Sequence, residues 1–73
     1  MRAKFHVESV TDFGHQKEVK LQAVICGSQE NQDFNSYTPS GALLMVIDKS
    51  GAMNYFKPGK EYYIDFTEAK END

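Results

Sequence analysis

Cysteine is nearly absent from this sequence of 73 residues, and tryptophan is missing altogether. The single cysteine, Cys26, excludes an intrachain disulfide and a zinc site built from several thiolates. The chain therefore suits a reducing compartment. A chain this short also allows one domain with a modest core.

Long hydrophobic runs and an excess of positive charge are also missing. No apolar run approaches the roughly 18 residues that span a bilayer, and MRAKFHVESV at the start lacks the hydrophobic stretch of a secretion signal. We expect a protein of the cytoplasm or of an assembled particle, without a membrane partner. The net charge of -3 argues against a general nucleic-acid coat, because such proteins neutralise phosphates with Lys and Arg.

Catalytic and metal-binding motifs are not found. Neither His6 nor His15 has a Cys, His or carboxylate at metal-ligand spacing, and Cys26 as a nucleophile would need a histidine brought to it by the fold. Glu61 and Asp65 share a strand face, but strand rise places them about 13 Å apart. We therefore predict a protein that is not an enzyme and has no cofactor, metal ion or catalytic residue.

The residues that are present alternate as in half-buried strands. In AKFHVESV, Phe5 and Val7 lie on one side, and KEVKLQAVIC repeats the pattern with inward residues that include Val19 and Leu21. The intervening DFGHQ predicts a hairpin turn, since Asp12 can bond its own downstream backbone and Gly14 can take a positive φ.

The second half of the chain predicts further strands and one helix. ALLMVID is nearly all apolar, which favours a strand buried on both faces at the centre of the sheet. Ser50 can cap a short helix that ends at Lys57-Pro58. KPGK then predicts a type II turn before a last strand, EYYIDFTEA.

These elements predict a mainly β (α+β) fold, a small antiparallel sheet or barrel-like domain of four to five strands with one short helix before the last strand. We expect a single domain over 1–68 and a charged flexible tail over 69–73. The predicted core consists of Phe5, Val7, Val19, Leu21, Ile25, Leu43, Met45, Ile47, Phe56, Ile64 and Phe66.

A long polar connection, GSQENQDFNSYTPSG, separates two of the apolar segments. Connections beyond about 12 residues in a compact domain are usually functional, locally structured or disordered. Phe34 and Tyr37 are three apart, as on one face of a helical turn, with Ser28 available as a cap. The two rings either dock the connection onto the sheet or serve as anchors for a partner.

A second group of aromatic residues lies near the last strand. Tyr62 and Tyr63 cannot face the same core, so one of them lies on the other face of the sheet, where a partner or a single-stranded base could meet it. The residues predicted to bind a partner are Glu30, Asp33, Phe34, Tyr37, Tyr55 and Tyr63.

Two segments, SQENQDFNSYTPSG and FKPGKEYYIDFTEA, resemble the signature segments of a family of small, mostly uncharacterised proteins of tailed bacteriophages. The likeness runs from the first strand to Thr67, and the matching residues are Glu30, Asn31, Phe34, Thr38, Pro39, Gly41, Pro58, Gly59, Tyr63 and Phe66. The resemblance implies a phage origin, and no established activity comes with it.

Three binding functions remain open. The first is a phage-encoded protein that occupies a host protein in the host cytoplasm as an inhibitor or modulator, with a defence system as one candidate target. The second is a virion component, such as a capsid decoration or head-completion protein, in a homo-oligomer or lattice. The third, a module for single-stranded nucleic acid or a nucleotide signal, ranks last because no phosphate-binding motif is present.

Overall fold

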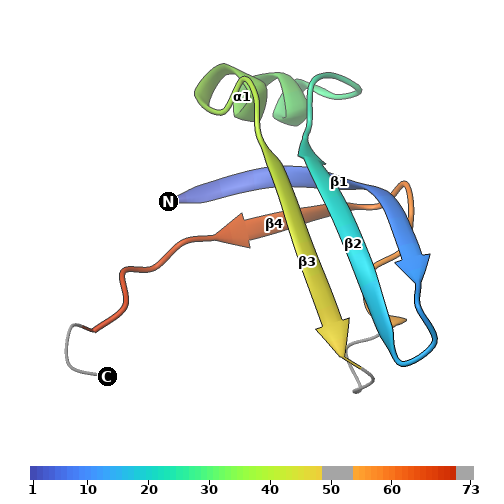
Figure 1. Cartoon of the computed structure of the whole chain (residues 1–73). Coiled ribbons are helices and arrows are strands. Elements are labelled where there is room, and N and C mark those ends of the chain that lie inside the picture. Colours follow the sequence, from blue (N-terminus) through green and yellow to red (C-terminus); the bar gives the residue numbers. More distant parts are fainter. Residues whose placement is uncertain (49–53, 71–73) are drawn as a thin grey trace.

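The computed structural model describes residues 1–48 and 54–70. The described residues form an antiparallel sheet in the order β3-β2-β1-β4, with one helix (Figure 1). The fold is mainly β, as predicted. The sheet is open and does not form the barrel-like alternative. The elements are β1 (Arg2–Asp12), β2 (Gln16–Ala23), α1 (Gln29–Tyr37), β3 (Ala42–Asp48) and β4 (Glu61–Asp65).

β1 is the central strand on which the sheet is built. Phe5 pairs with Ala23 of β2 on one side and with Tyr62 of β4 on the other. The register shifts between Val7 and Ser9, as in a β-bulge, and such irregularities bend a strand. The pairing with β4 ends near this point, so β1 joins two parts of the sheet that run in different directions (Figure 1).

The prediction that ALLMVID forms the centre of the sheet is wrong. β3 pairs with β2 alone and lies at one edge, and Leu44 and Val46 are each 57% exposed. An apolar run indicates how strongly a strand prefers burial, but it does not specify the strand's position in the sheet. The described helix contacts β1. Within the described part of the chain, no helix covers the face of β3 that carries Leu44 and Val46.

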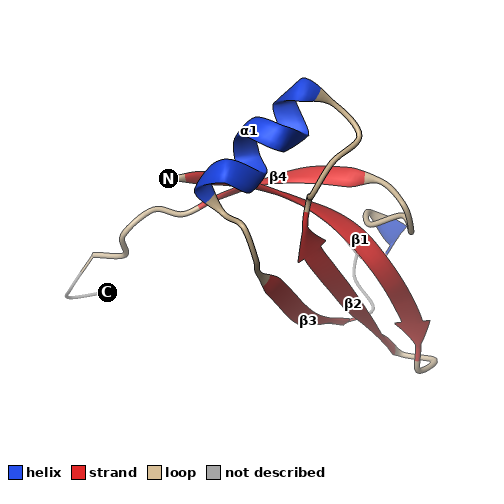
Figure 2. Cartoon of the chain, turned by 90° about the horizontal axis from the view of Figure 1, so that it is seen from above, coloured by secondary structure: helices blue, strands red, loops and turns tan. Residues whose placement is uncertain are grey.

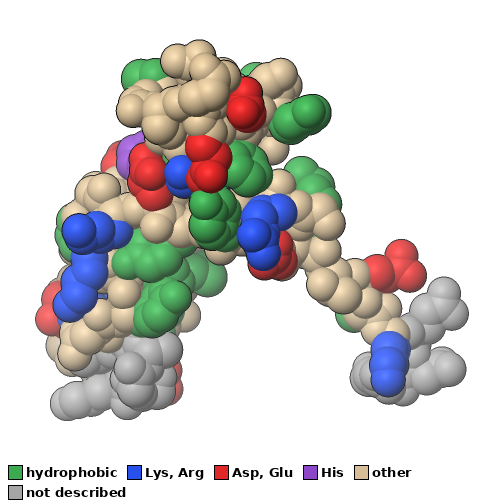
Figure 3. All heavy atoms as spheres, turned by 180° about the vertical axis from the view of Figure 1, so that it is seen from behind, with side chains coloured by type: hydrophobic (Ala, Val, Ile, Leu, Met, Phe, Trp, Pro, Cys, Tyr) green, Lys and Arg blue, Asp and Glu red, His purple; other side chains and the backbone are tan. Residues whose placement is uncertain are grey.

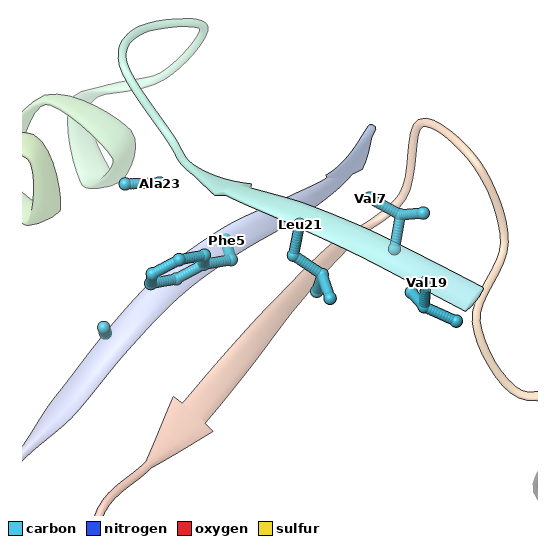
Figure 4. Close-up of a cluster of buried hydrophobic side chains, with 6 residues drawn as sticks. Phe5, Val7, Val19, Leu21 and Ala23 are labelled. Carbon is cyan, nitrogen blue, oxygen red and sulfur yellow. The ribbon is translucent and has the colours of Figure 1, made fainter. Parts of the chain in front are cut away.

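The core occupies one face of the sheet and is small (Figure 4). In the part of the chain that the structure describes, six buried residues from β1 and β2 form it, and half-buried residues from β3 and β4 and from the segment before β4 extend it. The buried residues are Ala3, Phe5, Val7, Val19, Leu21 and Ala23, and the half-buried ones include Leu43, Met45, Ile47, Phe56, Tyr62 and Ile64.

Two residues of the predicted core are on the surface. Ile25 is 67% exposed and Phe66 is 57% exposed. Both lie just beyond the last residue of a strand, Ala23 in β2 and Asp65 in β4. The alternation of the sequence continues past the strand ends, and the N–H of Phe66 still donates to the carbonyl of Met1 at 2.8 Å, but the buried cluster does not reach this far. A residue can therefore keep the pattern and still be exposed.

The two predicted turns are confirmed. The backbone N–H of Gly14 donates to the Asp12 carboxylate at 2.7 Å. In KPGK, the N–H of Lys60 donates to the carbonyl of Lys57 at 3.1 Å, and Gly59 has a φ of 83°, as a type II turn requires. The helix predicted from Ser50 begins outside the described residues.

The described helix instead forms in the polar connection between β2 and β3. It lies over β1 at one end of the sheet, and the turn between β1 and β2 lies at the other end (Figures 1 and 2). Register places Lys4 of β1 opposite Tyr63 of β4, on the face opposite Phe5 and Tyr62. The sheet therefore has an apolar face, which carries the core, and a polar face, to which α1 is bonded.

Candidate partner-binding face

The local sequence explains why a helix begins at Gln29. Ser28 has an extended backbone, and its hydroxyl oxygen accepts the N–H of Asn31 at 3.0 Å, which is the N-cap expected from the sequence. The last turn closes where the N–H of Thr38 donates to the carbonyl of Phe34 at 2.8 Å. Pro39 follows, and a residue before proline is disfavoured in helical geometry. The long polar connection is therefore locally structured.

Two asparagines hold the inner side of the helix. The amide nitrogen of Asn31, a residue only 1% exposed, donates to the carbonyl of Cys26 at 3.0 Å and to the carboxylate of Glu61 at 2.8 Å. One turn later, the amide of Asn35 donates to the carbonyl of Val24 at 3.2 Å. No docking role was predicted for either residue from the sequence. Their spacing of four was the available signal, because it places both on one helix face.

An ion cluster joins the helix to β1 and β4 beneath its first turn. Lys4, whose side chain is 11% exposed, lies 2.7 Å from an oxygen of Glu30 and 3.4 Å from an oxygen of Glu61. The hydroxyl of Tyr63 donates to the same Glu30 oxygen at 2.6 Å. Acidic and basic side chains lie side by side below the helix on this face (Figure 3).

These contacts shift the pKa values of the groups involved. The hydrogen bond from Lys4, followed by that from Tyr63, lowers the pKa of Glu30. The same carboxylate raises the pKa of Lys4 and that of Tyr63. Glu30 is therefore ionised at neutral pH, and one lysine between two carboxylates leaves the cluster with an excess of negative charge.

The ring of Tyr63 connects the helix to the outer part of β4. Its centroid lies 5.9 Å from that of Phe34, and the guanidinium carbon of Arg2 lies 5.0 Å from it, within the range of a cation–π contact. Arg2 is held in place by two hydrogen bonds to Asp65, at 2.7 and 3.1 Å. Tyr63 thus has a fixed position although it is 50% exposed.

Five of the six residues predicted to bind a partner meet in this region. Glu30, Asp33, Phe34 and Tyr37 line a shallow hollow of about 170 Å³ on the outer side of α1, and Tyr63 contacts two of them. We call these five residues the acidic–aromatic face. Tyr37 is 84% exposed, whereas Phe34 is half-buried. Of the two interpretations of this pair of rings, docking fits Phe34, and Tyr37 remains available to a partner.

Tyr55, the sixth predicted residue, does not join the acidic–aromatic face. Its ring lies 5.6 Å from that of Tyr62 and 5.0 Å from that of Phe56, on the apolar face of the sheet. The hydroxyl of Tyr62 donates to the carbonyl of Tyr55 at 3.1 Å and accepts the N–H of Lys57 at 3.0 Å. Tyr55 therefore belongs to an aromatic cluster that extends the core.

Elsewhere in the described residues, the groups that could serve catalysis or metal binding are less well assembled. His6 and Cys26 line one hollow of about 360 Å³ together with Glu61, but no hydrogen bond joins the imidazole to the thiol. Within 1–48 and 54–70, no three His, Cys, Asp or Glu residues gather closely enough to hold a metal ion. No helix of this part of the chain is long and apolar enough to cross a membrane.

Comparisons with protein-family models, with curated proteins and with solved structures found no match. No family is assigned to the chain by these comparisons. The resemblance to the phage proteins stays a prediction.

Proposed function

We propose that this protein is a non-enzymatic binding module that contacts a basic surface of another protein through its acidic–aromatic face. The observation that carries the proposal is the convergence of Glu30, Asp33, Phe34 and Tyr37 around one hollow on the exposed side of α1. Tyr63 supports this group from β4.

The chemistry of the face suits a protein partner. Exposed tyrosines are common anchors of interfaces because they bury a large ring at a small cost in conformational entropy. Asp33 adds negative charge beside Tyr37, since its carboxylate accepts a hydrogen bond from the neutral amide of Gln29 at 3.0 Å. Negative charge of this kind speeds the approach of a basic partner and selects against acidic ones.

The acidic–aromatic face is also ordered in the unbound protein. Asn31 and Asn35 fix the inner side of the helix, and the cluster of Lys4 and Glu30 fixes its first turn. A surface that is already ordered loses less conformational entropy when it binds. This favours binding by a preformed surface over folding of the segment on the partner.

The resemblance to phage proteins suggests that the proposed partner is a protein of the bacterial host. A small phage protein of this kind would occupy a host protein and block its surface, as an inhibitor or modulator. Assembly in a virion is the competing proposal, and the uncovered edge of β3 is the observation that favours it.

The test is affinity capture from lysate of infected host cells with tagged wild-type protein and two variants. Tyr37→Ala and Asp33→Asn change exposed residues of the face without touching the contacts that dock the helix. Phe13→Ala and Glu68→Gln are matched controls, because both residues are exposed and neither belongs to the acidic–aromatic face. Circular dichroism verifies that each variant is folded.

Capture of one host protein by wild type and both controls, with loss of that protein in Tyr37→Ala and a weaker signal in Asp33→Asn, would support the proposal. Equal capture by all variants would place the binding surface elsewhere. Mass spectrometry of purified particles completes the experiment. Recovery of the protein in particles at lattice stoichiometry, with no host protein captured, would replace the proposal by the virion component.

A further inference from the structure

β3 carries apolar side chains on a face where its neighbour is polar. Leu44 pairs with Lys20 of β2, and Val46 pairs with Glu18. Register therefore places these two apolar side chains on the polar face of the sheet, where each is 57% exposed. In an antiparallel sheet with one solvated face, such positions are normally polar.

The two edges of the sheet differ in how they are protected. Natural edge strands avoid pairing with other chains through charges, prolines, bulges or very short length. β4 is short and carries Glu61 and Asp65. In β3 the residues from 42 to 47 are all uncharged and apolar, and the pairing with β2 is regular from one end to the other.

The hydrogen-bond pattern identifies which backbone groups of β3 point outward. The N–H of Ala23 donates to the carbonyl of Gly41 at 2.9 Å, so this pair of residues is hydrogen-bonded. Bonded pairs recur at every second residue of an antiparallel ladder, which directs residues 43, 45 and 47 toward β2. The N–H and C=O groups of Leu44 and Val46 therefore point away from β2, toward the outer edge.

We propose that a second copy of this chain pairs with this edge, β3 against β3 in antiparallel orientation, about a two-fold axis at Met45. In this register Leu44 lies opposite Val46 of the second copy, and each pair exchanges backbone hydrogen bonds through outward groups. Met45 lies opposite Met45 of the second copy at a non-hydrogen-bonded position. The dimer is a continuous sheet in which each β3 becomes an inner strand.

β3 is complementary to itself in this register. On the polar face, Leu44 and Val46 cover one another across the axis, and on the apolar face Leu43 lies opposite Ile47 of the second copy. The only charged residue of the strand, Asp48, lies opposite Ala42. A shift that brings the two copies of Asp48 face to face places like charges opposite each other, which is unfavourable.

The small core argues for a second copy rather than a foreign strand. A domain of about 70 residues is near the lower limit for stable folding alone, and association is a common remedy. Among the described residues, six form the buried cluster, and Leu43, Met45 and Ile47 are half-buried at its open side. Pairing at β3 joins the apolar faces of the two copies along the strand that each leaves open.

The first test is the mass of the full chain in solution, measured by light scattering over a dilution series. Wild type is expected at about twice the 8.3 kDa of one chain. Val46→Lys and Leu44→Pro are expected at half that mass. The proline removes only an outward N–H and is tolerated at an edge strand. Phe66→Lys is the matched control, because Phe66 is also 57% exposed and lies outside β3.

The second test is the register. In a Cys26→Ser background, Met45→Cys is expected to form an intermolecular disulfide on mild oxidation, because residues opposite one another at non-hydrogen-bonded positions are within disulfide distance. Leu43→Cys alone is expected not to do so, whereas Leu43→Cys combined with Ile47→Cys is. Circular dichroism verifies the fold of each variant.

A monomeric wild type at every concentration overturns the proposal and leaves the edge to a strand of another protein. A dimer that persists in both Val46→Lys and Leu44→Pro, or that crosslinks equally through residues 43 and 45 alone, also overturns it. The result is independent of the acidic–aromatic face, since Tyr37→Ala is expected to remain dimeric.

Discussion

The side-chain amide of Asn31 on α1 donates to the carboxylate of Glu61 on β4 across 2.8 Å. The same amide also holds the carbonyl of Cys26, so one buried group links the helix, its preceding loop and an edge strand. The hydrogen bond from Asn31 is the main cause that lowers the pKa of Glu61. The helix is therefore docked by polar contacts, and their loss should be measurable.

Asn31→Asp is expected to destabilise the domain by about 1–3 kcal/mol at neutral pH, because it removes a donor and places a buried carboxylate beside Glu61. The loss should shrink near pH 4, where a carboxyl raised in pKa by burial and by a like charge is protonated. Urea unfolding at both pH values measures it. An equal loss at the two pH values would argue against the repulsion.

Leu21→Ala is expected to cost about 2–5 kcal/mol, enough to unfold much of so small a domain. Leu21 is 1% exposed at the middle of the core (Figure 4). Ile25→Ala is the matched control and should change stability by less than about 1 kcal/mol, since Ile25 is 67% exposed. Similar losses in the two variants would contradict the placement of Ile25 outside the core.

Stability should decline at both ends of the pH scale. The pKa values of Glu30, Glu61 and Asp65 are lowered in the folded state, so their contribution is complete above the ordinary values of 4.5 for glutamate and 3.8 for aspartate. It is lost as the pH falls through the folded pKa values. The pKa values of Lys4 and Tyr63 are raised, so their contribution is complete below about pH 10 and is lost above it.

The urea midpoint measured across this range checks the expectation. A plateau between about pH 5 and pH 10 with a fall on either side is the expected profile. Glu30→Gln should flatten the alkaline fall, because it removes the carboxylate that raises the pKa of Lys4 and Tyr63. An unchanged alkaline limb in this variant would mean that other groups cause it.

The phenol of Tyr63 should titrate above the ordinary pKa of about 10, because its hydrogen bond to Glu30 stabilises the neutral form. Ultraviolet titration of wild type, Glu30→Gln and Tyr63→Phe separates this phenol from the other tyrosines. Glu30→Gln should bring the highest phenol pKa down, and Tyr63→Phe should remove that step. If the highest step persists in Tyr63→Phe, it belongs to another tyrosine.

The strands and turns could largely be predicted because their signals are local. Alternation identified the faces of Phe5, Val7, Val19 and Leu21, and the turn at Gly59 followed from its neighbours. The lateral position of β3 could not be predicted in this way. That position depends on which strands pair, and nothing local to ALLMVID distinguishes an inner strand from an edge that another chain covers.

The helical part of the acidic–aromatic face could be predicted from local signals, whereas its contact with β4 could not. Phe34 and Tyr37 showed a helical spacing that the structure confirms, and Ser28 was recognised as the cap. The hydrogen bond from Tyr63 to Glu30 depends on the pairing of β4 with β1, which joins distant parts of the sequence. Tyr55 was assigned by residue type alone, and the structure places it on the apolar face, apart from the other five residues.

The pairing of β1 with β4 also bears on how the chain reaches its fold. Arg2 meets Asp65 only when residues 63 positions apart come together, whereas β1 and β2 are joined by a short turn. Closing so large a loop costs entropy that local contacts do not repay, and such pairings slow folding. We therefore expect the pairing of β1 with β4 to form after the hairpin of β1 and β2.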